Sequence, residues 1–261
     1  MENKILIVED NKTLANLIAK KISNDIDFEI DVAYSLKEAK LFLAKNNYFT
    51  TLLDINLPDA PDGEVVDYAI KKGQHVIVLS ANIDKEFREK MLNKDIVDYV
   101  NKSGIDDINY IIQTIKRLHK NIQHRVVVVD NSIPSRKKMQ ILLENMYFKV
   151  FGVAHGEEVM GIIDKYNDIS LIITNDKLPV MDGLELISEV RKRYSKNILS
   201  IIVLSSNDDG ASTALFLKKG ANDYIKNPFS KEEFSCRINN AVEAIENIKI
   251  ISDYQVEFDD L

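Results

Sequence analysis

Acidic, hydroxyl and lysine side chains stand just past the ends of short apolar runs in the first half of the chain. They are Glu9, Asp10, Asp54, Ser80 and Lys102. One carboxylate oxygen of an aspartate can attack phosphorus and form an aspartyl phosphate. A metal ion and a lysine can stabilise the charge on the phosphoryl oxygens during such a transfer. Any one of these residues alone is typical of a solvated loop, but together they indicate phosphoryl transfer to an aspartate.

The acidic residues of this set also predict a cation. Glu9, Asp10 and Asp54 carry like charges, which are costly to bring together unless a positive ion neutralises them. Mg²⁺ prefers one or two carboxylates together with water and phosphate oxygens. We therefore expect Mg²⁺ as the cofactor, with Lys102 as a fixed positive charge and Ser80 as a hydroxyl donor.

The second half of the chain repeats the pattern without three of its charged residues. Three amides replace them: Asn131 corresponds to Asp10, Asn175 to Asp54 and Asn227 to Lys102. The match of Asn175 rests on an offset (175 − 54 = 121) that the prolines four residues later share (179 − 58 = 121). Asn175 cannot form an acyl phosphate, and Asn131 is a poor ligand for Mg²⁺. We expect a degenerate second site that retains Asp130 and Ser205.

Charged residues beside the degenerate site allow two interpretations. Asp176 follows Asn175, but a shift of one residue on a strand points a side chain to the opposite face. Lys177 and Lys226 could place an ammonium where the metal ion would be, or they could be ordinary surface lysines. In either interpretation, phosphorylation is expected only in the first half.

The length and composition of the chain limit its class. A chain of 261 residues suits two domains, and its net charge of −7 lacks the basic excess of a protein that reads nucleic acid. The single cysteine, Cys236, excludes an internal disulfide and fits a reducing compartment. No apolar run approaches the roughly 20 residues that span a bilayer, and the first residues run directly into a strand pattern rather than a signal peptide. We expect a cytoplasmic protein that binds neither membrane nor nucleic acid.

Each half alternates five short apolar runs with amphipathic helical patterns. The runs, such as Ile5–Val8 and Val126–Val129, are rich in Val, Ile and Leu, which is typical of parallel strands covered by helices on both faces. Five strands alternating with five helices predict a doubly wound α/β fold, in which polar residues past the strand ends converge on one crevice. We place the domains at residues 1–122 and 123–250, followed by a frayed tail at residues 251–261.

The last helix of the second half is expected from about Lys231 to Ile250, and its apolar stripe is longer than one sheet can cover. Packing on its own sheet explains most of this stripe, and a coiled-coil extension that forms a homodimer is the alternative. The corresponding helix of the first half runs through to Ile122, which leaves almost no flexible linker between the domains.

These motifs strongly resemble the receiver domain of two-component response regulators. The matching features are the acidic pair after the first strand, the aspartate four residues before Pro58 with Asp62-Gly63 following, a Val-Leu-Ser run, and the pattern Asp-Tyr-x-x-Lys. The resemblance covers residues 3–120 and 124–247. It implies two flavodoxin-like (βα)₅ domains, each with a parallel five-stranded sheet of order 2-1-3-4-5.

The resemblance implies a role for each residue of the first set. Asp54 would accept a phosphoryl group from a sensor histidine kinase or a phosphotransfer protein. Glu9 and Asp10 would hold Mg²⁺ together with the backbone carbonyl of Asn56. Ser80 and Lys102 would grip the phosphoryl group, and Tyr99 would be the aromatic switch. One departure is an extra residue in the run Asp59-Ala60-Pro61, which should not disturb Asp54.

Tandem receivers with one degenerate copy resemble the front end of regulated diguanylate cyclases. The chain has no Gly-Gly-Asp-Glu-Phe signature, so we expect it to have no cyclase activity of its own. We expect the chain to be either a piece of a longer regulator or a stand-alone relay protein. In both cases the second half would serve as an adaptor or dimerisation domain.

A phosphatase of the haloacid-dehalogenase type would need a second aspartate at position 56, which is Asn56. A dinucleotide-binding enzyme would need a glycine-rich turn after the first strand, which is absent.

Overall fold

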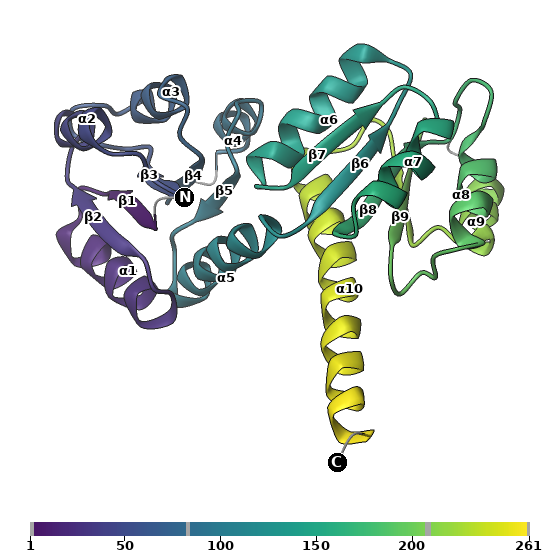
Figure 1. The fold of residues 1–261 in the computed structure, drawn as a ribbon. Helices are drawn as coiled ribbons and strands as arrows, with labels where there is room; N and C mark the ends of the chain where they lie inside the picture. The colour runs from purple at the N-terminus through teal and green to yellow at the C-terminus, as the bar shows by residue number, and fades with distance from the viewer. Residues whose placement is uncertain (1–2, 82–83, 207–209, 260–261) are drawn as a thin grey trace. The chain divides into compact units, whose positions relative to one another are not determined.

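The computed structural model describes residues 3–81, 84–206 and 210–259. The chain folds into two compact units, residues 1–119 and 120–261, which we call the first and the second unit (Figure 1). Each unit holds one parallel sheet of five strands. No helix in the described ranges is both long and apolar enough to cross a membrane.

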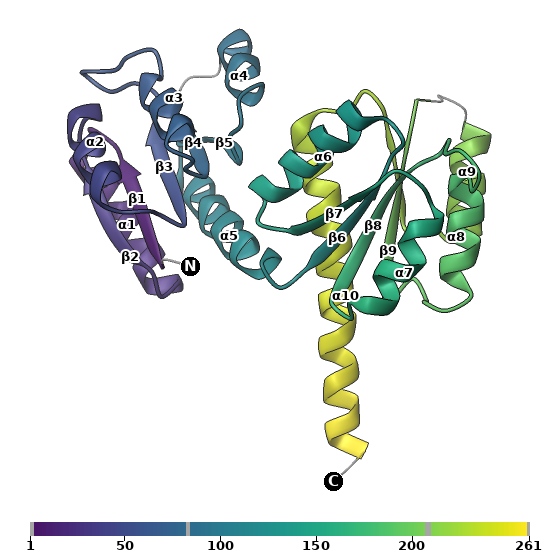
Figure 2. The ribbon, with the colours of Figure 1, turned by 45° about the horizontal axis from the view of Figure 1, so that its top comes forward.

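The first unit alternates strands and helices along the chain. Its strands are β1 (Lys4–Val8), β2 (Glu29–Ala33), β3 (Thr50–Asp54), β4 (Val76–Ser80) and β5 (Asp98–Asn101). Its helices are α1 (Lys12–Asp25), α2 (Leu36–Lys45), α3 (Glu64–Lys71), α4 (Lys85–Leu92) and α5 (Ile105–Asn121). The strand order β2-β1-β3-β4-β5 confirms the predicted topology. Helices α1 and α5 cover one face of the sheet, and α2, α3 and α4 cover the other (Figures 1 and 2).

The second unit repeats this arrangement. Its strands are β6 (Arg125–Val129), β7 (Lys149–Val153), β8 (Ile169–Asn175), β9 (Ser200–Ser205) and β10 (Asp223–Lys226). Its helices are α6 (Ile133–Asn145), α7 (Glu157–Lys165), α8 (Gly183–Arg191), α9 (Gly210–Lys219) and α10 (Lys231–Asp259). The order β7-β6-β8-β9-β10 is again that predicted for a doubly wound sheet.

Buried apolar side chains on both faces of each sheet explain the unbroken apolar runs. Every residue from Ile5 to Val8 is fully buried, and so are Val126 to Val129 in the corresponding strand. Burial of a Val, Leu or Ile side chain is worth about 1.5–3 kcal/mol, so the central strands anchor each unit. The carboxyl ends of these strands, and the polar residues that come directly after them, are thereby held in fixed positions.

The chain turns directly from β1 into α1, which leaves the acidic pair at the strand end. Asn11 is the N-cap of α1, and its side chain accepts hydrogen bonds from the backbone N–H groups of Thr13 and Leu14. These bonds satisfy N–H groups that have no partner inside the helix. Glu9 and Asp10 are therefore confined to the two positions between the strand and the helix cap.

Helix α10 differs from the sequence-based prediction at its end. Phe234, Ile238 and Val242 are fully buried, so the first half of the helix packs within the second unit as expected. The helix then continues to Asp259 rather than fraying from residue 251. Figure 2 shows this distal part extending away from the sheet. Each residue added to an existing helix gains one backbone hydrogen bond. The 29-residue helix therefore continues from its packed first half into its polar end.

The extra residue in the loop after β3 places Asp59 against a neighbouring helix. Its Oδ1 accepts a hydrogen bond from the N–H of Leu36 at 2.8 Å, and its Oδ2 accepts one from the N–H of Lys37 at 2.9 Å. Slight burial acts to raise the pKa of Asp59, but these bonds and the charge of Lys40 outweigh it and lower the pKa. The loop beside the candidate phosphoacceptor is thus tied to the amino end of α2.

We predict that Asp59→Ala lowers the stability of the protein only at pH values at which the carboxylate of Asp59 is ionised. A carboxylate whose pKa is lowered by folding stabilises the folded state above its unfolded pKa, and this contribution is lost as the pH falls through the folded pKa. Because the side chain is exposed, the expected loss is about 0.5–1 kcal/mol near pH 7. Urea unfolding from pH 7 down to about pH 3 measures it. A loss that stays constant across this range would contradict the assignment.

Candidate functional site

The predicted residues of the first half meet at the carboxyl edge of its sheet. Glu9 and Asp10 follow β1, Asp54 ends β3, Ser80 ends β4 and Lys102 follows β5. These four strands are adjacent in the order β1-β3-β4-β5 and run parallel, so their carboxyl ends lie side by side. This is the edge at which open α/β sheets bind ligands.

Three carboxylates gather at this edge. Glu9 is 1% exposed and Asp54 2%, whereas Asp10 is exposed. One oxygen from each of the three lies within 4.8 Å of the others. Burial raises the pKa of Glu9, the hydrogen bond from Lys102 opposes this rise, and the charge of Asp54 adds to it. An all-oxygen set of hard ligands, two of them buried, fits Mg²⁺.

Lys102 joins two of these carboxylates. Its Nζ lies 2.7 Å from Oε2 of Glu9 and 2.6 Å from Oδ2 of Asp54, and its side chain is 9% exposed. Burial alone would lower the pKa of Lys102, but the hydrogen bonds to Asp54 and Glu9 outweigh burial and raise it. The ammonium therefore stays charged at neutral pH, where phosphoryl oxygens could take over its contacts.

The remaining predicted residues lie around Asp54. The backbone N–H of Asn56 donates to Oδ1 of Asp54 at 3.1 Å. Ser80 is fully buried, and its carbonyl accepts a hydrogen bond from the N–H of Lys102 at 2.9 Å. The ring of Tyr99 is 8% exposed and packs in the core of the first unit, with the guanidinium of Arg88 5.9 Å from its centroid. The aromatic side chain thus lies inside the domain in this structure.

Backbone hydrogen bonds establish which residues of the second unit correspond to this site. The N–H of Asp130 donates to Val153 as that of Glu9 donates to Ala33. The N–H of Asn227 donates to the carbonyl of Ser205 at 2.7 Å, as that of Lys102 donates to Ser80. Asn227 therefore occupies the position that corresponds to Lys102.

Asp176 occupies the place of a buried apolar residue. Its N–H donates to Leu204 as that of Ile55 donates to Leu79, and Ile55 is 1% exposed. Asp176 is itself buried, and its Oδ2 accepts a hydrogen bond from Oγ of Ser205 at 2.5 Å. From the sequence we expected the side chain to point to the opposite face, and its bond with Ser205 was not predicted. An aspartate at a position that is apolar in the first copy is the signal that could have revealed it.

Comparison with known proteins decides what kind of domain carries these sites. A family model described as the response regulator receiver domain matches the chain twice, over residues 5–116 and 126–239. The chain belongs to the response regulator receiver domain family. The two units are receiver domains in tandem, and the first receiver holds the full acidic set.

Two solved structures match both receivers at once. One, described as a putative two-component system response regulator/GGDEF domain protein, is 35% identical with a TM-score of 0.82, and the match covers 93% of this chain and 99% of that chain. The other, described as a probable two-component system response regulator/GGDEF domain protein, is 34% identical with a TM-score of 0.81 and the same coverage. These structures support the tandem arrangement of the receivers.

Curated relatives match over the length of a single receiver. The probable transcriptional regulator ycf27 of Cyanidium caldarium is 32% identical over 124 residues, which is 48% of this chain and 48% of that protein. The aerobic respiration control protein ArcA of Escherichia coli K12 is 28% identical over 128 residues, which is 49% of this chain and 52% of that protein. The chain spans about half the length of the curated relatives it matches.

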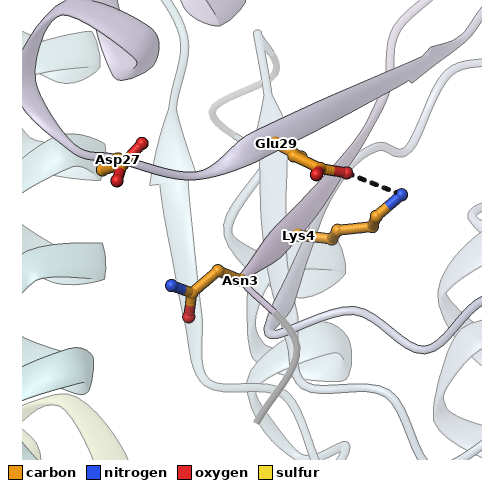
Figure 3. A pocket seen from close by; sticks show the side chains of 4 residues that line it. All are labelled: Asn3, Lys4, Asp27 and Glu29. Carbon is orange, nitrogen blue, oxygen red and sulfur yellow. Dashed lines mark ion pairs between the residues drawn. The ribbon is translucent and has the colours of Figure 1, made fainter.

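A hollow at the opposite edge of the first receiver has a different character. It is lined by Asn3, Lys4, Asp27 and Glu29, which lie around the start of β1 and β2 (Figure 3). Nζ of Lys4 and Oε2 of Glu29 form an ion pair at 2.8 Å, and the side chain of Glu29 is 74% exposed. Exposed ion pairs of this kind contribute little, so we assign this hollow no part in the chemistry.

Proposed function

We propose that this protein is a two-component response regulator whose first receiver is phosphorylated on Asp54. The phosphoryl group would come from a histidine of a sensor kinase or a phosphotransfer protein. The observation that carries the proposal is the contact of Lys102 with both Glu9 and Asp54 at one buried site. The second receiver has an asparagine at the nucleophile position, so it would not be phosphorylated there.

The proposed transfer needs one nucleophile and a means of neutralising charge. A carboxylate oxygen of Asp54 attacks phosphorus, and the bond from phosphorus to the donor nitrogen breaks, so the imidazole leaves and takes up a proton from water. Mg²⁺ held by Glu9, Asp10, Asp54 and the backbone carbonyl of Asn56 would offset the negative charge of the phosphoryl oxygens. Lys102 exchanges a carboxylate contact for a phosphoryl oxygen and holds the product.

We predict that Mg²⁺ binds the full chain at one site and that Asp10→Asn weakens this binding about tenfold or more, because it removes an anionic ligand. Calorimetric titration of the full chain gives both the number of sites and the affinity. The control is Glu29→Gln, which removes an exposed carboxylate at the opposite edge of the same sheet and should leave the affinity unchanged. A second Mg²⁺ site of comparable affinity would contradict the proposal that the second receiver is degenerate.

Phosphorylation would act by shifting the first receiver between two packings. Ser80 and Lys102 grip the phosphoryl group. The loop after β4 was expected to be drawn inward, and part of it, residues 82–83, lies outside the described residues. Such a ligand shifts the equilibrium only by its different affinity for the two packings. Tyr99 already lies inside the domain in this structure, so we propose that the gripped phosphoryl group stabilises this inward position.

We predict that Ser80→Ala leaves Asp54 able to accept phosphate but weakens binding of beryllofluoride, a phosphoryl analogue, about tenfold or more, since one hydrogen bond to a charged group is worth about 1.5–3 kcal/mol. Titration followed by NMR measures this affinity. Ser103→Ala, which removes an exposed hydroxyl next to Lys102, serves as the control. Equal affinities for both variants would remove Ser80 from the switch.

The second receiver would serve as an adaptor or dimerisation domain for an output that is not in this chain. The two solved structures that match both receivers are of response regulator/GGDEF domain proteins, which supports control of a diguanylate cyclase domain. Light scattering with and without beryllofluoride tests the adaptor role. An unchanged oligomeric state and unchanged hydrogen exchange in the second receiver would contradict it.

A further inference from the structure

A cavity of about 330 Å³ opens at the degenerate site of the second receiver. Its lining comes from the loop after β6, one face of α6, the ends of β8 and β9, and the segment after β10, and includes Asp130, Lys138, Met139, Asn175, Leu204 and Phe229. This volume is at the lower end of the range for small-molecule sites, which is about 300–1,000 Å³. Lys177 and Lys226 are exposed and are not among the lining residues.

Asp130 is a buried carboxylate that has lost the cation of its counterpart. It is 2% exposed, and Glu9, at the same position in the first receiver, pairs with Lys102 at 2.7 Å. In the second receiver the lysine is Asn227. Within the described residues the carboxylate of Asp130 forms no ion pair, and Nη1 of Arg136 donates to its backbone carbonyl at 2.5 Å rather than to the carboxylate. Oδ1 of Asp130 accepts from the N–H of Ser132 at 2.8 Å and Oδ2 from Oγ of Ser135 at 2.6 Å. A carboxylate can accept further hydrogen bonds, and a buried one favours a positive partner.

The same cavity offers a positive group and an apolar wall. Lys138 follows Ser135 by three residues on α6, so both lie on the face that lines the cavity. The Nζ of Lys138 lies 5.8 Å from the centroid of the Phe229 ring, which stacks on Phe234. Met139 and Leu204 are 2% and 5% exposed and complete the apolar part of the lining.

We propose that the degenerate site of the second receiver binds a small zwitterion with an apolar side chain, of the α-amino acid class. The ammonium of the ligand replaces the lost lysine beside Asp130, its carboxylate meets Lys138, and its side chain lies against the apolar wall. Asn175 and Asn227 supply neutral donors and acceptors in place of a nucleophile and a lysine. The second receiver would thus report a metabolite to the same output that Asp54 controls.

The test is binding of leucine, methionine and phenylalanine to the full chain, followed by NMR or calorimetry. For an amino acid that binds, the analogue without its carboxylate and the analogue without its ammonium are compared (isoamylamine and 4-methylpentanoate for leucine). We expect saturable binding of at least one amino acid and at least about tenfold weaker binding of both analogues, because each lacks one charge-assisted contact. Equal binding of an analogue would overturn the proposal, and so would a cavity that takes only Mg²⁺ or inorganic phosphate.

Matched variants place the ligand in this cavity. Lys138→Met should weaken binding about tenfold or more, whereas Lys137→Met, at the exposed neighbour that does not line the cavity, should not. Ser206→Trp fills the rim from an exposed position and should abolish binding in a folded protein. All three variants should still accept phosphate on Asp54, which separates this proposal from the function of the first receiver. Binding that is unaffected by Lys138→Met and Ser206→Trp would overturn it.

Discussion

Asp54→Asn should abolish covalent phosphorylation of the chain. Asp54 is buried at the end of β3, and its carboxylate contacts Lys102 at 2.6 Å and the N–H of Asn56 at 3.1 Å. An amide at this position keeps the shape of the side chain but cannot form an acyl phosphate, so the loss should be complete rather than partial. Intact-mass measurement after treatment with acetyl phosphate and Mg²⁺ should show one phosphoryl group on the unaltered chain and none on the variant.

Two other aspartates serve as controls for this experiment. Asp176→Asn removes the buried carboxylate that accepts a hydrogen bond from Ser205, and Asp59→Asn removes the helix-bound carboxylate near Asp54. Both variants should be labelled to the same extent as the unaltered chain. Label that persists in Asp54→Asn and maps to Asp176 would show that the second receiver is itself a phosphoacceptor.

Arg191→Met should strongly destabilise the second receiver. The guanidinium donates from Nε to the carbonyl of Gly220 at 2.8 Å, from Nη1 to those of Leu199 at 2.9 Å and Tyr194 at 3.1 Å, and from Nη2 to Oδ1 of Asn222 at 2.8 Å. Burial lowers the pKa of Arg191 to about 10, so it remains charged at neutral pH. The variant removes this donor from three backbone carbonyls, whereas Oδ1 of Asn222 keeps its bond from the N–H of Ile201. The expected loss is on the order of 3 kcal/mol.

Hydrogen exchange measured by mass spectrometry assigns the loss to the second receiver. Protection should fall in β9 and β10, whose preceding loops Arg191 joins, and remain unchanged in the first receiver. Arg193→Met is the matched control, because Arg193 pairs with Asp164 where both side chains are more than half exposed. It should cost less than about 1 kcal/mol. Equal effects of the two variants would contradict the role of Arg191 as a tie between loops.

Several contacts that shape the sites could not be predicted from the sequence. Asp59 binds the amino end of α2 across 23 positions of the chain. Asp176 meets Ser205 across 29 positions. Such contacts depend on the conformations that loops and side chains adopt once the sheet has formed. Hydrophobic periodicity carries no information about these conformations. The helical end of α10 was missed for a different reason, because a polar, acidic segment gives a weak local signal.

The sequence by itself determined the strands, their parallel packing and the residues of the first site. Unbroken runs such as Ile5–Val8 can only be buried on both faces, and polar residues past the ends of parallel strands must share one edge. The loss of charge at Asn175 and Asn227 was also visible there, because the repeat supplies its own reference. Only the tertiary structure decided that Lys102 holds two carboxylates at once and that a cavity remains beside Asp130. Both depend on side-chain distances between separate strands, which packing sets and spacing along the chain does not.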